Sequence, residues 1–508
     1  MERDKWSSRS TFVLAAIGSA VGLGNAWRFP GLAAKHGGGA FLLVYLLAMI
    51  FFGIPLLMME ISIGRKMRQS APGALAGINK KLEPIGWAAT ANAFVIVTYY
   101  AVVFAWVILM AGISYKFAGL TGNTEAARSL WATTIKTTGT VSGYGTIAWP
   151  VLIALVIAWG AIYYCIRNGT ESVGKVIKYT VLLPVICLLI LAVRGFFLPG
   201  SIDGLVKFFV PDFSALSSVT IWIDACGQVF YSLSIMMAIM IAYGSFLDRD
   251  TNVALDATII AFCDMAVSVL AGIVTFLTMG GVGMLDNISA SGIATAFFIY
   301  PQAIVLLTNT GWVNAIFAFI FYFCLCTLAI DSAFSLVEGV STAISDRFEV
   351  PKKKTTIIVC LVSGAISLFF VTGAGLAWLD IVDNWCNNYN LILIGIIESI
   401  AIGWIFNTTK VLEEVNRNTK KLKMPAGFFN IAIKFIAPAI LTAFFIWNIV
   451  TLIRNGGIYG AADGYTLTSN ILGGWLISVL VFASGYIIKA LFKNKMVKDI
   501  QSWDEIDK

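Results

Sequence analysis

Two acidic residues lie inside long apolar stretches of this 508-residue chain. Asp264 is in segment 254–280, and Asp331 is in segment 312–345. An ionisable side chain is costly in a segment of this kind and marks a functional site by default. Carboxylate oxygens are ligands that hard cations prefer. We therefore expect both residues to bind a cation.

A glycine-rich segment near the N-terminus contributes polar groups to the same chemistry. It has the sequence FVLAAIGSAVGLGNAWRFP, in which Asn25 and Arg28 follow three glycines. Glycine weakens a helix and admits close backbone approach. A second polar interruption, with Gln228, Ser232 and Ser234, lies in segment 217–247. Paired interrupted helices indicate a transporter site, here between the first and the sixth helix.

The composition excludes most other classes of protein. The chain is 58% hydrophobic and 12% charged, whereas soluble domains carry about 25% charged residues. A soluble domain, a disordered chain and a nucleic-acid binder are therefore excluded. A β-barrel is also excluded, because its strands are segments of roughly ten residues with alternating polarity. The apolar runs of this chain are long and continuous, which is typical of membrane helices.

Twelve spans and a short amphipathic stretch, 290–307, are expected. The spans are 11–34, 40–64, 87–118, 146–165, 174–195, 217–247, 254–280, 312–345, 355–372, 376–407, 428–454 and 471–492. Lysine and arginine gather on the side of segment 1–10 and of the tail 493–508, so both termini are expected in the cytoplasm. The chain is thus predicted to be a multi-pass protein of the plasma membrane.

Six ordered motifs resemble those of the neurotransmitter:sodium symporters. They are GSAVGLGNAWRFP (18–30), HGGGAF (36–41), GIPLLMMEISIGR (53–65), GQVFYSLS (227–234), DSAFSLVEG (331–339) and LDIVDNW (379–385). The likeness spans essentially the whole chain and is strongest to bacterial amino-acid transporters with the leucine-transporter fold. It implies one all-α integral membrane domain, 1–508, with helices 1 and 6 unwound at mid-membrane. The inverted five-helix repeats would be 11–195 and 217–407, with two extra helices in 428–492.

The resemblance implies that two sodium ions are co-transported. The first site would use Ala20, Asn25, Ser232 and Asp264, together with the substrate carboxylate. The second site would use Gly18, Val21, Leu328, Asp331 and Ser332. Both sets offer the oxygen ligands that sodium requires.

The same resemblance implies an α-amino acid as the substrate. Gly22 leaves room for a carboxylate where monoamine carriers have an aspartate, and Tyr100 would donate a hydrogen bond to it. Met236 and Met237 stand where many relatives have more space, so a small neutral amino acid such as glycine or alanine is expected. A larger hydrophobic amino acid is the alternative. The expected contacts are Ala20, Gly22, Leu23, Gly24, Ile96, Tyr100, Tyr231, Ser232, Ser234, Met236, Met237 and Leu336.

Chloride is expected not to be required. The positions that line chloride in dependent members of the family are Tyr45, Gln228, Ser232 and Ser268. Asp264 lies one turn before Ser268 and would supply a permanent negative charge in place of the ion.

Two gates follow from the resemblance. The outer gate would pair Arg28 with Asp383 above a lid made by Tyr100 and Tyr231. The inner gate would consist of Arg3, Trp6 and Asp346, with Phe246 in place of a tyrosine of the family's network. Gly174 and Pro184 match a pattern that unwinds the fifth helix in relatives.

Other classes of function are less consistent with the sequence. His36 is the only histidine, and no nucleophile–base motif or phosphate loop points to an enzyme. No repeated filter loop indicates a channel. A transport-inactive sensor of sodium and amino acid stays open. The expected partners are the lipid bilayer, sodium and the amino acid, without nucleic acid; a monomer would suffice for transport, and a dimer stays open.

Overall fold

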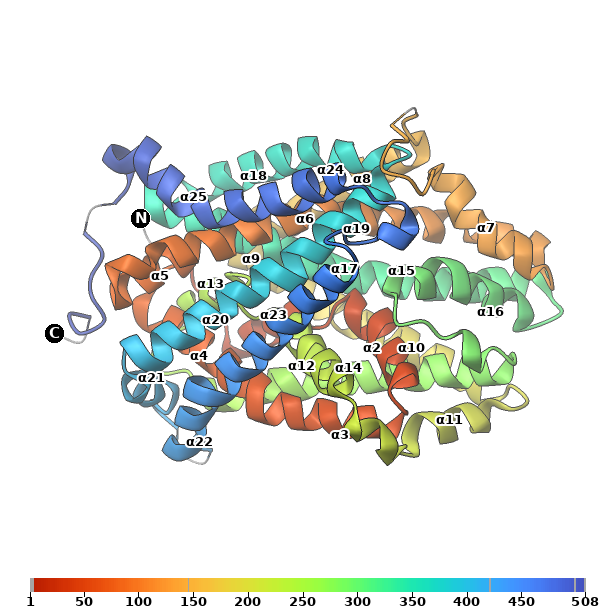
Figure 1. Cartoon of the computed structure of the whole chain (residues 1–508), viewed down its shortest axis with the longest axis horizontal. Helices are drawn as coiled ribbons and strands as arrows, with labels where there is room; N and C mark the ends of the chain where they lie inside the picture. The colour runs from red at the N-terminus through yellow and green to blue at the C-terminus, as the bar shows by residue number, and fades with distance from the viewer. Residues whose placement is uncertain (1–3, 145, 420–421, 498, 507–508) are drawn as a thin grey trace.

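Long helices run along the longest axis of the molecule and pack side by side (Figure 1). The structure is a computed structural model that describes residues 4–144, 146–419, 422–497 and 499–506. Within these residues, ten uninterrupted helices are long and apolar enough to cross a membrane. They are Gly39–Met67, Lys80–Gly112, Trp149–Ile166, Thr170–Phe196, Val253–Gly281, Gly311–Phe348, Lys352–Val371, Gly375–Ile405, Ala426–Arg454 and Leu467–Lys495. Helices satisfy their backbone groups internally, which the hydrocarbon of a bilayer requires.

The two remaining spans are broken in the middle, which confirms the expected unwinding. Helices α1 (Arg9–Ala20) and α2 (Leu23–Lys35) meet at an angle of 51°. Helices α12 (Val219–Ser232) and α13 (Ile239–Ser245) are separated by residues 233–238. The first pair brings the candidate spans among the described residues to eleven. Helices α12 and α13 lie in the remaining expected span, and both interruptions fall at the glycine-rich and serine-containing motifs.

The break between α12 and α13 is held in an uncommon backbone conformation. Ser234, Met236 and Ala238 have φ angles of 53°, 62° and 61°, a region that non-glycine residues rarely occupy. The backbone N–H of Met236 donates to both carboxylate oxygens of Glu60 in α4 (Ile54–Met67), at 3.1 and 3.2 Å. The Ser234 hydroxyl donates to the carbonyl of Ser19 in α1, at 2.9 Å. Neighbouring helices thus stabilise the strained segment.

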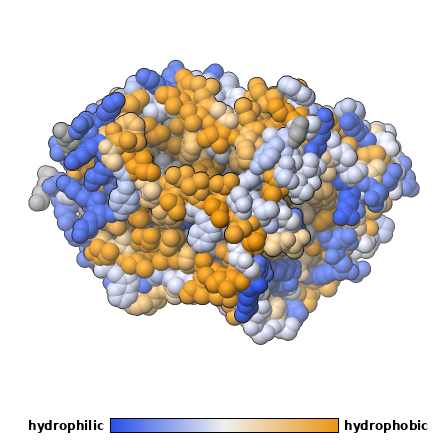
Figure 2. Space-filling model, turned by 45° about the horizontal axis from the view of Figure 1, so that its top comes forward, coloured by the Kyte–Doolittle hydropathy of each residue, from blue (hydrophilic) through white to orange (hydrophobic). Residues whose placement is uncertain are grey.

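The two ends of the molecule are polar and its middle is apolar. On the face shown in Figure 2, hydrophobic residues form most of the middle, while hydrophilic residues gather toward the two ends. The N- and C-terminal regions lie at the same end (Figure 1), which agrees with an even number of spans. We call the end with the termini the inner end and the opposite end the outer end.

Two further details concern the short amphipathic stretch and the fifth span. The short amphipathic stretch is present as Gly292–Leu306. The fifth span consists of α9 (Thr170–Thr180) and α10 (Leu182–Phe196), which meet at Val181. Gly174 therefore lies within a helix in this structure. A methyl group on it would come 2.9 Å from the side chain of Thr11, so this glycine allows α9 to lie against α1.

Candidate substrate and ion site

A cavity of about 450 Å³ lies between the two broken spans and extends toward the outer end. Its walls come from α1, α2, α12, α6 (Glu83–Gly112), α17 (Gly311–Phe348) and α19 (Gly375–Trp385). Apart from Met236, every residue expected to contact the substrate lines it: Ala20, Gly22, Leu23, Gly24, Ile96, Tyr100, Tyr231, Ser232, Ser234, Met237 and Leu336. Ser19, Val103 and Ile239 also line it and were not expected; Ser19 and Ile239 are close in sequence to the predicted positions.

The structure corrects the expected position of Met236, which does not line the cavity. The residue is fully buried, and its side chain packs against Gly395 of α20 (Ile392–Ile400), where an added Cβ would come 3.5 Å from its Cγ. It is not among the residues that line the cavity, whereas Met237 is. The positive φ at Met236 directs consecutive side chains of the unwound segment differently from a helix. Only one of the two methionines therefore limits the cavity.

Asp264 is the centre of a buried cluster of polar side chains. Its Oδ1 accepts hydrogen bonds from the Ser232 hydroxyl at 2.6 Å and from Nδ2 of Asn25 at 2.7 Å. Its Oδ2 accepts a hydrogen bond from the Tyr45 hydroxyl at 3.3 Å. Ser268 accepts a hydrogen bond from Asn25 at 2.8 Å. Helix α14 (Val253–Gly281) thus brings its carboxylate against both broken spans.

Gln228 lies beside this cluster. Its Nε2 donates to the carbonyl of Gly24 at 3.3 Å, and its buried Oε1 has no hydrogen-bond partner in the described part of the chain. The Asp264 carboxylate already accepts from Tyr45 and Ser232, which are two of the positions similar to a chloride site. A fixed negative charge is therefore present at these donors.

Asp331 forms a second acidic position, against the end of α1. It is 2% exposed, and its Oδ1 has no hydrogen-bond partner among the described residues. A Cβ on Gly18 would come 2.7 Å from its Oδ2, so the backbone of α1 closely approaches this carboxylate. Helix α1 ends at Ala20, and the last carbonyls of a helix lack intrahelical partners. A buried carboxylate next to such carbonyls is a candidate ligand for a cation.

Gly22 and Tyr100 face each other at the start of α2. A Cβ on Gly22 would lie 2.8 Å from the Ser332 hydroxyl and 3.9 Å from the Tyr100 hydroxyl. That tyrosine hydroxyl is buried and has no hydrogen-bond partner in the described chain. Gly22 is the N-cap of α2, so the free N–H groups of the first turn point toward this part of the cavity. Such a helix start favours a bound anion.

The expected outer ion pair is not formed in this structure. The Arg28 guanidinium lies over the ring of Tyr231, 5.0 Å from its centroid. Asp383 instead accepts a hydrogen bond from the side chain of Asn387 at 2.8 Å. The Tyr231 hydroxyl donates to the carbonyl of Asn387 and to the side chain of Asn388, both at 2.9 Å. Arg28 and Asp383 nevertheless line the same cavity.

The inner end is closed by aromatic packing. Trp6 is 7% exposed, and its indole N–H donates to the carbonyl of Tyr243 at 3.0 Å. Its ring packs edge-on against Tyr243 and Phe246. Asp346 accepts a hydrogen bond from the backbone N–H of Ser70 at 2.7 Å. Arg3 lies outside the described residues.

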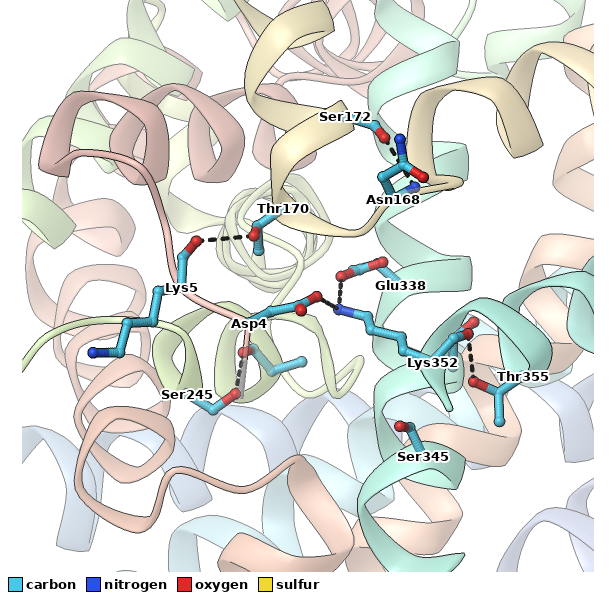
Figure 3. A network of polar contacts seen from close by, with 12 residues as sticks. Asp4, Lys5, Asn168, Thr170, Ser172, Ser245, Glu338, Ser345, Lys352 and Thr355 are labelled. Atoms are coloured by element: carbon cyan, nitrogen blue, oxygen red, sulfur yellow. Dashed lines mark hydrogen bonds and ion pairs between the residues drawn. The ribbon is translucent and has the colours of Figure 1, made fainter. Parts of the chain in front are cut away.

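Lys352 binds acidic side chains of two other segments (Figure 3). Lys352 at the start of α18 (Lys352–Ser367) forms an ion pair with Asp4 at 2.9 Å and another with the buried Glu338. The same ammonium lies 4.2 Å from the ring centroid of Phe246. No sequence motif indicated a role for Lys352. Its partners are far apart in sequence, so no local pattern predicted the contact.

Comparisons with known proteins agree with this arrangement. The model of the sodium:neurotransmitter symporter family matches residues 3–123 and 113–494. An uncharacterised sodium-dependent transporter of Methanocaldococcus jannaschii is 33% identical, with 99% of each chain covered. A sodium-dependent neutral amino acid transporter of Mus musculus is 29% identical, covering 91% of this chain and 86% of that protein. The crystal structure of MhsT in complex with L-phenylalanine matches with a TM-score of 0.74 and 26% identity. The match covers 88% of this chain and 99% of that chain.

The alignments extend over nearly the full length of the chain, so they include both broken spans and the cavity between them. The similarity to MhsT confirms the fold that the six motifs implied. The chain therefore belongs to the sodium:neurotransmitter symporter family, and it is a sodium-dependent membrane transporter rather than an enzyme.

Proposed function

We propose that the chain imports a neutral amino acid together with two sodium ions by alternating access. The observation that carries this proposal is the pair of helix breaks around one cavity, with unpartnered polar atoms at Asp331 and Tyr100. An unpartnered buried carboxylate oxygen suits a cation, and an unpartnered hydroxyl beside a helix start suits a carboxylate. The sodium-dependent relatives support the coupling ion, and the neutral amino acid carrier of the mouse supports the class of substrate.

The substrate carboxylate would lie between the N-terminus of α2 and the Tyr100 hydroxyl. Gly22 supports this position, because a side chain there would meet Ser332 and fill the space. The amine would face the carbonyls at the end of α1, which carries the negative pole of that helix. Beyond these groups the cavity is lined by Ile96, Met237 and Leu336, which suit an apolar side chain. A neutral amino acid therefore fits better than a charged one.

The size of the substrate side chain is less restricted than the sequence alone suggested. Glycine or alanine was expected because two methionines would narrow the pocket. Met236 is turned toward Gly395, so only Met237 limits the space. We propose an amino acid with an apolar side chain and retain glycine and alanine in the tested set.

Sodium would occupy the two acidic positions. At the first position, the Asn25 amide would turn to present its oxygen beside Ser232 and Asp264. The Ser232 hydroxyl and Oδ1 of Asp264 are 2.6 Å apart. At the second, Asp331 and Ser332 would be joined by carbonyls of Gly18, Val21 and Leu328. One charge crossing 100 mV gains about 2.3 kcal/mol. With tenfold gradients, two ions would supply roughly 7 kcal/mol, enough for about 10⁵-fold accumulation.

Chloride would not be required, because Asp264 supplies the negative charge. The hydroxyls of Tyr45 and Ser232 both donate to this carboxylate. Closure at the outer end would bring Arg28 to Asp383, and the inner plug around Trp6 would open afterwards. The structure would then represent a state with its inner end closed.

Uptake into proteoliposomes tests this proposal. An imposed inward sodium gradient should drive accumulation of at least one of the twenty amino acids, equally in chloride and in gluconate. Asp331→Asn should remove sodium stimulation, since it deletes the charge that holds the second ion. A protein that folds and shows no sodium-stimulated uptake or exchange of any amino acid would be a sensor rather than a transporter.

A further inference from the structure

The loop between the last two spans reaches the outer end of the cavity. It comprises residues 455–466, between α23 (Ala437–Arg454) and α24 (Leu467–Asn470). Tyr459 of this loop lines the cavity together with Asp380 and Asp383 of α19. The Tyr459 hydroxyl donates to Oδ1 of Asp380 at 3.3 Å, and the Tyr465 hydroxyl donates to Oδ2 at 3.1 Å. Both oxygens of one carboxylate are therefore bound by the same loop.

The loop is folded so that it presents both tyrosines together. The side chain of Asn470 accepts from the N–H of Tyr459 and donates to its carbonyl, each at 3.1 Å. Tyr465 donates its N–H to the carbonyl of Gly460 at 3.1 Å. Gly460 has a φ of 69°, and a Cβ there would come 2.1 Å from the Tyr465 ring. Glycine at this position is thus required for the ring to lie against the loop.

Both phenols remain hydrogen-bond donors at neutral pH. Burial raises the pKa of Tyr459 and of Tyr465, and the nearby charge of Asp380 raises each pKa further. A protonated phenol can donate to a carboxylate, and a bond to a charged acceptor is stronger than one between neutral groups. The two hydroxyls therefore stabilise Asp380 as a carboxylate that points toward the loop.

This arrangement determines which of two carboxylates can form an ion pair with Arg28. Asp380 and Asp383 are three residues apart on α19, so they share a helix face. Both line the cavity with Arg28, which carries one positive charge and lies over Tyr231. If Asp380 were released from the loop, it would compete with Asp383 for this guanidinium. The loop tyrosines donate hydrogen bonds to Asp380. Among the described residues, no hydrogen bond joins Asp383 to the loop, and Asp383 accepts one from Asn387 of the same span.

We propose that Tyr459 and Tyr465 are positioning residues of the outer gate, which hold Asp380 and so reserve Arg28 for Asp383. The inference rests on the proposed role of Arg28 and Asp383 in outer closure. According to this proposal, the loop 455–466 takes part in the transport cycle. Without the two hydroxyls, Arg28 would pair with Asp380 and closure over the substrate would be impaired.

The test uses the full chain in proteoliposomes, with uptake of L-alanine or of whichever of the twenty amino acids is taken up fastest. Tyr459→Phe/Tyr465→Phe keeps both rings and removes both hydroxyls. We expect the substrate concentration at half-maximal uptake to rise at least about tenfold, because two hydrogen bonds to a charged group are lost. The matched control is Tyr115→Phe/Tyr486→Phe, whose side chains are 67% and 66% exposed and should leave uptake unchanged.

A rescue experiment separates positioning from a structural role. The triple variant Asp380→Asn/Tyr459→Phe/Tyr465→Phe has no second carboxylate to compete for Arg28, so its half-maximal concentration should return close to that of the wild type. The inference is overturned if the double variant matches its control, or if the triple variant is as impaired as the double. Asp383→Asn tests the gate itself: normal uptake by this variant would refute the outer gate, whatever the tyrosine variants do.

Discussion

Gly18 faces the carboxylate of Asp331 so closely that a methyl group on its α-carbon would lie 2.7 Å from Oδ2. The same methyl group would lie 2.7 Å from Cδ1 of Ile177 in α9, so this side chain would have to shift as well. The end of α1 and the acid of α17 are thus in direct contact at this position. A cation held by backbone carbonyls and a carboxylate depends on such a close approach.

Gly18→Ala should therefore weaken sodium binding. Overpacking of this kind costs about 1–3 kcal/mol, so we expect the sodium concentration for half-maximal substrate binding to rise by about tenfold. The measurement is a sodium titration of amino acid binding to the purified protein. Gly160→Ala is the control, because a methyl group there would meet nothing within 4 Å. Equal sodium midpoints for the two variants would contradict the second sodium site.

Replacing Asp264 tests whether its charge substitutes for chloride. Asp264→Asn removes the negative charge and leaves the hydroxyl donors of Tyr45 and Ser232 without their carboxylate acceptor. Uptake by this variant should become dependent on chloride, whereas the wild type should transport equally in chloride and gluconate. Sodium-driven uptake is measured in both salts. Chloride dependence of the wild type, or its absence in an active variant, would refute the assignment.

The two adjacent methionines should have different effects on specificity. Met237→Ala enlarges the cavity and should admit larger side chains, because Met237 lines it. Met236→Ala should leave the order of preferred amino acids unchanged, since its side chain packs against Gly395. It should instead destabilise the protein by about 2–5 kcal/mol, the usual cost of truncating a buried methionine. Competition by a series of amino acids and thermal unfolding provide the two readouts, and a reversed pattern would contradict the structure.

Lys352 should stabilise the closed inner end. Lys352→Gln removes the ion pairs with Asp4 and Glu338 and leaves a buried carboxylate without its cation. The state with a closed inner end should be less populated, so the apparent affinity for substrate should fall in proportion. Equilibrium binding at saturating sodium measures this change.

The neighbouring lysine provides a matched control for this prediction. Lys353→Gln changes an exposed side chain of the same helix and should bind substrate normally. Glu338→Gln/Lys352→Gln should recover part of the affinity, because no unpaired charge is then buried. If Lys352→Gln and Lys353→Gln bind equally well, the lysine contact does not contribute to closure.

The resemblance to a known family implied most of the residues that line the cavity, whereas the residues themselves predicted the membrane bundle and both broken spans. These features depend on local composition: apolar runs form membrane helices, and glycine or serine within a run interrupts them. The motifs around Asn25, Ser232 and Asp264 also indicated which side chains meet, because the resemblance covered whole segments. The similarity to MhsT confirms the predicted fold.

Only the tertiary structure decided the direction of individual side chains and the partners of the charges. Met236 turns away from the cavity because of its backbone conformation and its bond to Glu60. Arg28 lies on Tyr231, Lys352 binds Asp4 and Glu338, and the tyrosines of a distant loop bind Asp380. These contacts join residues that are far apart along the chain, so their geometry follows from helix packing and leaves no local pattern in the sequence.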